Sequence, residues 1–170
     1  MKRAALFDRD GTLIVDTGYI SDPDDVVLIP GARRLISCLK ERGFAVCIVT
    51  NQSGIGRGMF TEADFRKVNR RVEELLGISF DAVEMCPHHP DDNCRCRKPL
   101  PFMLRRALKT CGCSEQGSFL AGDKRSDIEA GKRCGLKTFR YSPGSGGDCG
   151  QADDISDVTV RSLEEILEYV

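Results

Sequence analysis

The sequence of 170 residues has neither a long hydrophobic run nor an excess of one charge. No apolar stretch approaches the roughly 20 residues of a membrane-spanning helix. The opening segment MKRAALFDRDG has no apolar core of the signal-peptide type. We therefore predict a cytoplasmic protein with no membrane partner. Basic and acidic side chains number 25 and 26, for a formal net charge of −1. This balance excludes a strong electrostatic attraction to nucleic acid, which we do not expect as a partner.

Histidine is scarce, whereas cysteine is abundant. The chain has two histidines and nine cysteines, and both histidines lie in the same short segment as Cys86, Cys94 and Cys96. The odd number and uneven spacing of the cysteines do not match a disulfide framework. In a reducing compartment such a cluster favours a metal site over disulfides.

Strand-like and helix-like segments alternate along the chain. The segment 44–50 is a continuous apolar run, as expected of a strand covered on both faces, and 61–77 opens with a capping-box pattern and ends on glycine. The predicted strands are 4–7, 44–50, 80–86, 117–123 and 137–141. The predicted helices are 31–43, 61–77, 100–112, 126–135 and 162–170. This alternation predicts an α/β fold, a Rossmann-like three-layer α/β/α arrangement with a parallel sheet.

We expect residues 1–170 to form one domain. The chain shows no internal repeat, and no segment is long enough to form a separate cap domain over the site. The Gly- and Ser-rich segment 142–154 is predicted to be a mobile surface loop rather than a linker.

Polar side chains follow three of the predicted strands. Asp8 and Asp10 follow the first strand, Thr50 ends the second and Asp123 ends the fourth. In parallel sheets, sites form beyond the carboxyl ends of the strands, so these side chains are expected to meet in one crevice. Two aspartates this close repel each other, which a bound cation would relieve. The alternative is a solvated turn, since Asp and Gly11 are common turn residues.

The motifs DRDGT, TNQSGIGRG, CRKP and GDKRSD, in this order, resemble those of the haloacid dehalogenase (HAD) superfamily of phosphotransferases. The resemblance covers nearly the whole chain up to about Tyr141. A narrower match, through DTGYI, TNQSGIGRGMFTEADF, CPHHPDDNCRCRKPLP and GDKRSDIEAG, is with the D-glycero-D-manno-heptose 1,7-bisphosphate phosphatases. The neighbouring histidinol-phosphate phosphatases share the cysteine pattern, and the spacing from His88 to Cys94 equals theirs.

The resemblance implies a carboxylate nucleophile and a magnesium ion. Asp8 would form an aspartyl-phosphate, and Asp10 would protonate the departing sugar oxygen and later activate water. Asp8, the main-chain carbonyl of Asp10 and Asp123 would hold Mg²⁺, which prefers oxygen ligands. Asp127 either helps to hold the metal or caps the following helix.

The resemblance also implies groups that bind phosphate and sugar. Thr50 and Lys98 would contact the transferring phosphoryl group as catalytic residues, although a β-branched residue such as Thr50 also commonly ends a strand. Arg97 would recognise a second phosphate or the sugar oxygens through its planar fork. The remaining expected substrate-binding residues are Asp16, Thr17, Gly18, Tyr19, Asn51, Gln52, Ser53, Arg57 and Lys124.

The spacing C-x-H-x5-C-x-C of residues 86–96 supplies three thiolates and one imidazole, a complete tetrahedral set for structural Zn²⁺. With no open position for water, this zinc is not expected to be catalytic. The family pattern uses the first histidine, so the expected ligands are Cys86, His88, Cys94 and Cys96, and His89 is expected at the surface. The zinc would fix a loop poor in apolar residues, and so position Arg97 and Lys98.

These features predict a magnesium-dependent sugar bisphosphate phosphatase, acting as a monomer on a small phosphorylated sugar. The expected reaction converts D-glycero-D-manno-heptose 1,7-bisphosphate to the heptose 1-phosphate, and the alternative substrate is histidinol phosphate. A signalling receiver domain also places aspartates, a threonine and a lysine around a phospho-aspartate, but the paired Asp8 and Asp10 and the cysteine cluster argue against it. Intact Asp8, Asp10, Lys98 and Asp123 argue against a non-catalytic zinc module.

Overall fold

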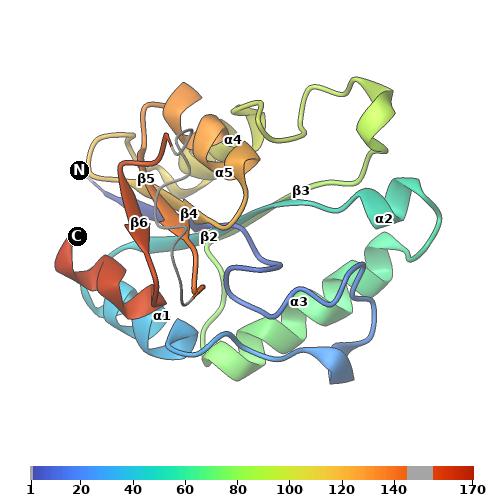
Figure 1. Ribbon diagram of the computed structural model, residues 1–170, viewed down its shortest axis with the longest axis horizontal. Coiled ribbons are helices and arrows are strands. Elements are labelled where there is room, and N and C mark those ends of the chain that lie inside the picture. The colour runs from blue at the N-terminus through green and yellow to red at the C-terminus, as the bar shows by residue number, and fades with distance from the viewer. Residues whose placement is uncertain (1, 145–154) are drawn as a thin grey trace.

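The computed structural model describes residues 2–144 and 155–170, which build one parallel sheet of six strands (Figure 1). The strand order is β3-β2-β1-β4-β5-β6, and every neighbouring pair is parallel. The strands are β1 (Ala4–Phe7), β2 (Ala45–Asn51), β3 (Ala82–Cys86), β4 (Phe119–Gly122), β5 (Lys137–Tyr141) and β6 (Val158–Val160).

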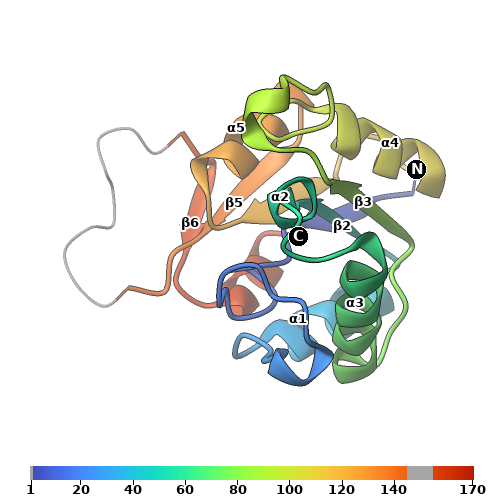
Figure 2. The ribbon, with the colours of Figure 1, turned by 90° about the vertical axis from the view of Figure 1, so that its right-hand side faces the viewer.

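Helices cover both faces of the sheet, which makes three layers (Figure 2). The α-helices are α1 (Ala32–Glu41), α2 (Ser53–Gly56), α3 (Glu62–Leu76), α4 (Phe102–Cys111) and α5 (Arg125–Arg133). Short 3₁₀ segments are η1 (Pro23–Asp25), η2 (Pro90–Asp92) and η3 (Leu163–Glu168). None of the helices described combines the length and the apolar character that a bilayer span requires.

The sheet divides the hydrophobic core in two. Successive residues of a strand point to opposite faces, so in β1 Ala5 and Phe7 pack with α1, α3 and η3, while Ala4 and Leu6 pack with α4 and α5. The first core contains edge-to-face aromatic contacts, with Phe119 5.8 Å from Phe7 and 5.2 Å from Phe139 between ring centroids. Since both faces are covered, the central strands are uninterrupted apolar runs.

The predicted architecture is confirmed, and the best predicted helix is α3. Thr61 and Asp64 form the expected reciprocal capping box, and Gly77 ends the helix with a φ of 74°. The other three helices and the five strands predicted before residue 142 agree with the structure to within a few residues. Of the predicted mobile loop 142–154, residues 145–154 lie outside the described residues.

Two features near the C-terminus differ from the prediction. A sixth strand, β6, pairs with β5 through Phe139 opposite Val158 and Tyr141 opposite Val160. The predicted α-helix 162–170 is instead the 3₁₀ segment η3, whose buried Leu163 and Ile166 are three residues apart. That spacing aligns side chains on one face of a helix with three residues per turn, so the apolar pattern was compatible with both helix types.

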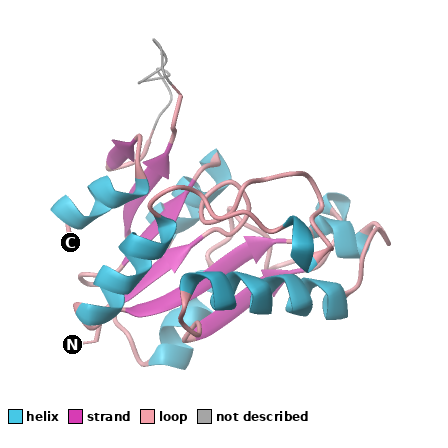
Figure 3. Cartoon of the chain, turned by 90° about the horizontal axis from the view of Figure 1, so that it is seen from below, coloured by secondary structure: helices cyan, strands magenta, loops and turns pink. Residues whose placement is uncertain are grey.

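The topology determines where a site can form. β1 lies between β2 and β4, and the strand order reverses direction at this point, where open α/β sheets bind ligands. Figure 3 shows the strands running in one direction, so that the loops after β1, β2 and β4 leave the same edge. Between β1 and α1, residues 8–31 form a loop with only η1, so no cap domain is inserted there.

Candidate active site

Three carboxylates converge beyond the carboxyl ends of β1 and β4. Asp8 follows β1, Asp123 follows β4, and Asp127 lies in the first turn of α5. One carboxylate oxygen of each lies within 4.8 Å of the others. We call Asp8, Asp123 and Asp127, together with Lys98, the carboxylate centre.

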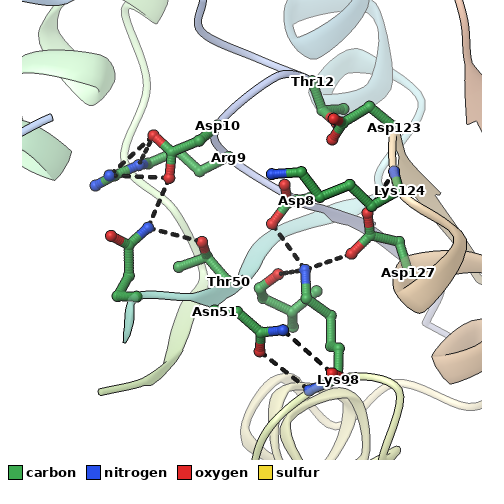
Figure 4. A network of polar contacts seen from close by, with 12 residues as sticks. Asp8, Arg9, Asp10, Thr12, Thr50, Asn51, Lys98, Asp123, Lys124 and Asp127 are labelled. Atoms are coloured by element: carbon green, nitrogen blue, oxygen red, sulfur yellow. Dashed lines mark hydrogen bonds and ion pairs between the residues drawn. The ribbon is translucent and has the colours of Figure 1, made fainter. Parts of the chain in front are cut away.

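Lys98 neutralises part of this charge from within the centre (Figure 4). Its Nζ lies 2.7 Å from Oδ1 of Asp8 and 2.6 Å from Oδ1 of Asp127, and it donates a 2.6 Å hydrogen bond to the carbonyl of Val49. The lysine side chain is 1% exposed. Burial alone would lower the pKa of Lys98, but the carboxylates of Asp127 and Asp8 raise it above its ordinary value. Lys98 is therefore a permanent cation at the centre.

The centre carries more negative charge than Lys98 balances. Burial, together with the charges of Asp8 and Asp127, raises the pKa of Asp123 to about 6. Burial also raises the pKa of Asp127, against the opposing effect of Lys98. A cluster of oxygen ligands with excess negative charge fits a divalent cation such as Mg²⁺.

The loop after β1 approaches the centre closely because it contains glycine. Gly11 has a φ of +88°, and a Cβ there would lie 2.6 Å from Oδ2 of Asp123. Next to it, Thr12 donates a 3.1 Å hydrogen bond from its hydroxyl to Oδ1 of Asp123. Asp127 is both a cap and a member of the centre, because its Oδ2 accepts the backbone N–H of Lys124 at 3.0 Å while Oδ1 faces Lys98. The two alternatives for Asp127 are therefore not exclusive.

Asp10 points to a different set of partners. Nη2 of Arg9 lies 3.0 Å from its Oδ1 and 3.1 Å from its Oδ2. The amide nitrogen of Gln52 donates to Oδ2 of Asp10 at 2.6 Å and to the hydroxyl of Thr50 at 2.9 Å. The side chain of Asp10 is 17% exposed and lines a cavity at this end of the sheet.

Asn51 is bonded to the main chain of Lys98. Its Oδ1 accepts the N–H of Lys98 at 3.0 Å, and its Nδ2 donates to the carbonyl of Lys98 at 3.2 Å. This two-way amide contact connects the end of β2 to the segment before α4, so the backbone of Lys98 is anchored independently of the cysteine cluster.

A cavity of about 310 Å³ opens beside the centre. It contains eight of the ten predicted substrate-binding residues, while Thr17 and Arg57 are exposed outside its lining. Its lining also includes Ile20 and Ser126, which the sequence did not single out. The predicted residues that line it are Asp16, Gly18, Tyr19, Asn51, Gln52, Ser53, Arg97 and Lys124.

Two basic side chains face this cavity from different segments. Nη1 of Arg97 is buried and has no hydrogen-bond partner among the described residues. Lys124 pairs with Asp16 at 3.3 Å, which joins the loop after β4 to the loop after β1. Burial would raise the pKa of Asp16, but the N–H of Gly18 and the ammonium of Lys124 hold it below its ordinary value. The cavity therefore offers a ligand the guanidinium of Arg97 and the ammonium of Lys124, beside the carboxylates of Asp10 and Asp16.

The segment 86–96, which we call the zinc loop, gathers its four candidate ligands. Sulfur–sulfur distances are 3.0 Å for Cys86–Cys96, 3.5 Å for Cys86–Cys94 and 3.6 Å for Cys94–Cys96. Nδ1 of His88 lies 3.2 Å from the sulfur of Cys96. A Zn–S distance of about 2.3 Å implies edges of about 3.8 Å in a tetrahedral site, so these residues are compatible with zinc. His89 instead caps η2, accepting the N–H of Asp91.

Helix α2 lies against the zinc loop through backbone contacts. The N–H of Gly56 donates to the carbonyl of Pro87 at 2.8 Å, and that of Gln52 donates to the carbonyl of Cys86 at 2.8 Å. A Cβ on Gly56 would lie 2.5 Å from the backbone nitrogen of His89. Glycine is therefore needed at position 56 for this approach.

The parallel sheet carries paired aspartates after its central strand and a threonine at the end of the next strand, with a lysine and a further aspartate beside them. This arrangement defines a HAD-like hydrolase. The family model described as HAD-hydrolase-like matches residues 95–166. The D-glycero-beta-D-manno-heptose-1,7-bisphosphate 7-phosphatase of Haemophilus ducreyi is 32% identical over 99% of this chain and 98% of its own. The enzyme of the same name from Yersinia pestis is 41% identical over 79% of this chain and 77% of its own. The chain belongs to this family of phosphatases.

A solved structure supports the same placement. The D,D-heptose 1,7-bisphosphate phosphatase from B. bronchiseptica, complexed with magnesium and phosphate, superposes with a TM-score of 0.85. It is 30% identical, and the match covers 100% of both chains. The names of these relatives do not favour the histidinol-phosphate alternative.

Proposed function

We propose that this protein removes the 7-phosphate of D-glycero-β-D-manno-heptose 1,7-bisphosphate and releases the heptose 1-phosphate. The observation that carries the proposal is the carboxylate centre, in which buried Lys98 lies between Asp8 and Asp127. Lys124 and Ser126, the sequence neighbours of Asp123 and Asp127, line the cavity. The names of the relatives supply the substrate, and the site supplies the means of hydrolysing it.

The proposed reaction has two steps. Asp8 attacks the phosphorus, an Asp8–phosphorus bond forms, the bond to the sugar oxygen breaks, and Asp10 gives its proton to that oxygen. Water then attacks the phosphorus, its proton goes to Asp10, and the bond to Asp8 breaks, releasing phosphate. Lys98 and the hydroxyl of Thr50 stabilise the phosphoryl oxygens throughout.

Two metals are part of the proposal. Mg²⁺ held by Asp8, Asp123 and the carbonyl of Asp10 supplies positive charge to the transferring phosphoryl group. Asp127 belongs to the same cluster of carboxylates. Zn²⁺ held by Cys86, His88, Cys94 and Cys96 stiffens the loop that precedes Arg97.

The second phosphate of the substrate has a natural partner in Arg97. A guanidinium binds phosphate through two parallel hydrogen bonds, and Nη1 of Arg97 lacks a partner in the described chain. Lys124 and Asp16, which also line the cavity, would contact the sugar. The cysteines of the described residues are unpaired, which supports a location in a reducing compartment, the cytoplasm, and the enzyme is proposed to act as a monomer.

The test is a comparison of substrates under saturating Mg²⁺, with release of inorganic phosphate as the readout. The β anomer of heptose 1,7-bisphosphate is expected to have a kcat/KM at least about tenfold above that of the α anomer and of histidinol phosphate. Asp8→Asn serves as the inactive control. A higher kcat/KM for histidinol phosphate would overturn the proposed substrate.

A further inference from the structure

Arg9 is a buried cation inside the DRDGT motif. It is 0% exposed and is the largest fully buried side chain of the described residues. Its guanidinium carbon lies 4.9 Å from the ring centroid of Phe65 on α3, and its carbonyl accepts the N–H groups of Leu13 at 3.0 Å and Ile14 at 3.1 Å. A buried charge is costly unless it is paired and hydrogen-bonded, so its partner indicates what the residue is for.

That partner is Asp10. Nε of Arg9 donates to Oδ1 at 3.2 Å, and Nη2 donates to Oδ1 at 3.0 Å and to Oδ2 at 3.1 Å. Nη1 has no hydrogen bond in the described chain. All hydrogen bonds of the guanidinium are therefore directed to one carboxylate (Figure 4). The guanidinium itself lies over the ring of Phe65.

Gln52, the residue after β2, hydrogen-bonds to the same carboxylate. Its Nε2 donates to Oδ2 of Asp10 at 2.6 Å and to the hydroxyl oxygen of Thr50 at 2.9 Å. Because Thr50 accepts this hydrogen bond, its own proton is free to be donated to another acceptor. A single amide nitrogen thus connects the aspartate to the threonine at the phosphoryl site.

We propose that Arg9 and Gln52 form a clamp that positions Asp10 for proton transfer, with Arg9 as its main arm. This inference rests on the proposed function. Arg9 is fully buried, does not line the cavity and directs its hydrogen bonds to Asp10, so it is a positioning residue. In the first step the clamp orients the Asp10 proton toward the leaving oxygen as the phosphorus–oxygen bond breaks. In the second it orients the carboxylate to accept a proton from the attacking water.

The alternative role for Arg9 is structural, because stacking on Phe65 and a buried ion pair also affect folding. The two roles differ in their dependence on the leaving group. Proton donation assists a poor leaving group strongly and a good one hardly at all, whereas a fold defect lowers the rate for both by the same factor. The ratio of the two rates, measured on one preparation, does not depend on the fraction of folded protein.

The experiment compares first-turnover alcohol release from phenyl phosphate and from 2,4-dinitrophenyl phosphate, by rapid quench with saturating Mg²⁺. In Arg9→Met, release of phenol is expected to fall by about 100-fold, and release of dinitrophenol by less than about threefold. Arg9→Lys retains the charge without the fork and should fall between Arg9→Met and the wild type. Arg3→Met is the matched control, because the guanidinium carbon of Arg3 lies 4.1 Å from the ring centroid of Phe44, away from the site. The ratio of the two release rates in Arg3→Met should equal that of the wild type.

A second readout follows the phosphoenzyme. With 2,4-dinitrophenyl phosphate, Arg9→Met should accumulate more acid-stable phosphate on Asp8 than the wild type, because the base for the second step is misplaced. Equal slowing of both aryl phosphates, or no slowing of either, would overturn the clamp. Because both probes are simple aryl phosphates, an error in the heptose assignment would leave their ratio unchanged.

Discussion

The carboxylate centre and the zinc loop are two charged clusters at the same edge of the sheet, built in opposite ways. The residues of the centre follow β1, precede α4, follow β4 and lie in α5, and Asp8 and Asp127 are 5% and 1% exposed. The four candidate ligands of the zinc loop lie within residues 86–96, and His88 among them is exposed. The fold thus organises the centre before any ligand binds, whereas the loop depends on its own ligands. The centre should therefore control chemistry and the loop should control local order.

The largest effect is expected from removing the nucleophile. Asp8→Asn should abolish turnover, because an amide cannot form the aspartyl-phosphate, while the melting temperature shows that the fold is retained. Asp24→Asn, an exposed aspartate of η1, is the control. Turnover above a few percent of wild type in Asp8→Asn would remove Asp8 from its role.

The next effect concerns the cation of the centre. Lys98→Met should lower kcat by roughly 100-fold or more, the cost of losing an electrostatic stabiliser. It should also lower stability by about 3 kcal/mol or more, because Asp8 and Asp127 lose their buried partner. Lys109→Met, an exposed lysine of α4, should change neither quantity. Unchanged stability of Lys98→Met would show that the ion pairs seen around Nζ do not persist.

A smaller and different effect is expected from the zinc loop. Cys96→Ser should lose bound zinc and lower the melting temperature by about 5 °C or more. It should raise KM for the bisphosphate through Arg97 and lower kcat less than Lys98→Met does, since Asn51 holds the backbone of Lys98. Cys38→Ser, a half-buried cysteine of α1, serves as the control. Elemental analysis that finds no zinc in the wild type would refute this account of the loop.

The smallest effect is expected at Asp64, a carboxylate outside both clusters, which serves as a reference for the other three predictions. Hydrogen bonds from the hydroxyl and N–H of Thr61, helped by Lys67, lower the pKa of Asp64 to about 2. A carboxylate with a lowered folded pKa adds stability above its unfolded pKa of 3.8 and loses it as pH falls toward 2. Asp64→Asn should therefore lower the melting temperature by a few degrees at pH 7 and by progressively less below pH 4, with kcat unchanged. A difference that stays constant from pH 7 to pH 2 would contradict the role of its charge.

Local signals in the sequence were sufficient for most of the fold. Apolar runs and helix caps such as Thr61 and Gly77 depend on neighbours in the sequence, and the structure contains the elements they predict. β6 was missed because three residues, Val158–Val160, carry no periodic pattern and become a strand only by pairing with β5. The helix type of η3 was missed because its two buried residues fit both geometries.

The site shows the same division between local and distant information. Strand ends and motifs predicted that Asp8, Asp10, Thr50 and Asp123 meet in one crevice. The structure groups Asp8 with Asp123, and connects Asp10 to Thr50 through Gln52. Contacts between distant segments, such as Asn51 with the backbone of Lys98, depend on packing that the sequence does not display. Arg9 was overlooked although it lies inside a recognised motif. An arginine between two strand-end aspartates was the available signal, but its burial appears only once α3 is in place.

The comparison between the two clusters is tested most directly by locating the phosphoryl group in the wild type and in Cys96→Ser. Each protein is mixed with p-nitrophenyl phosphate and Mg²⁺, quenched in acid during the first turnover and examined by peptide mass spectrometry. We predict phosphorylated Asp8 in both proteins, at comparable levels per folded chain, with zinc absent from the variant. Phosphate on another residue, or no phosphoenzyme in the zinc-free variant, would contradict the assignment of chemistry to the carboxylate centre and of local order to the zinc loop.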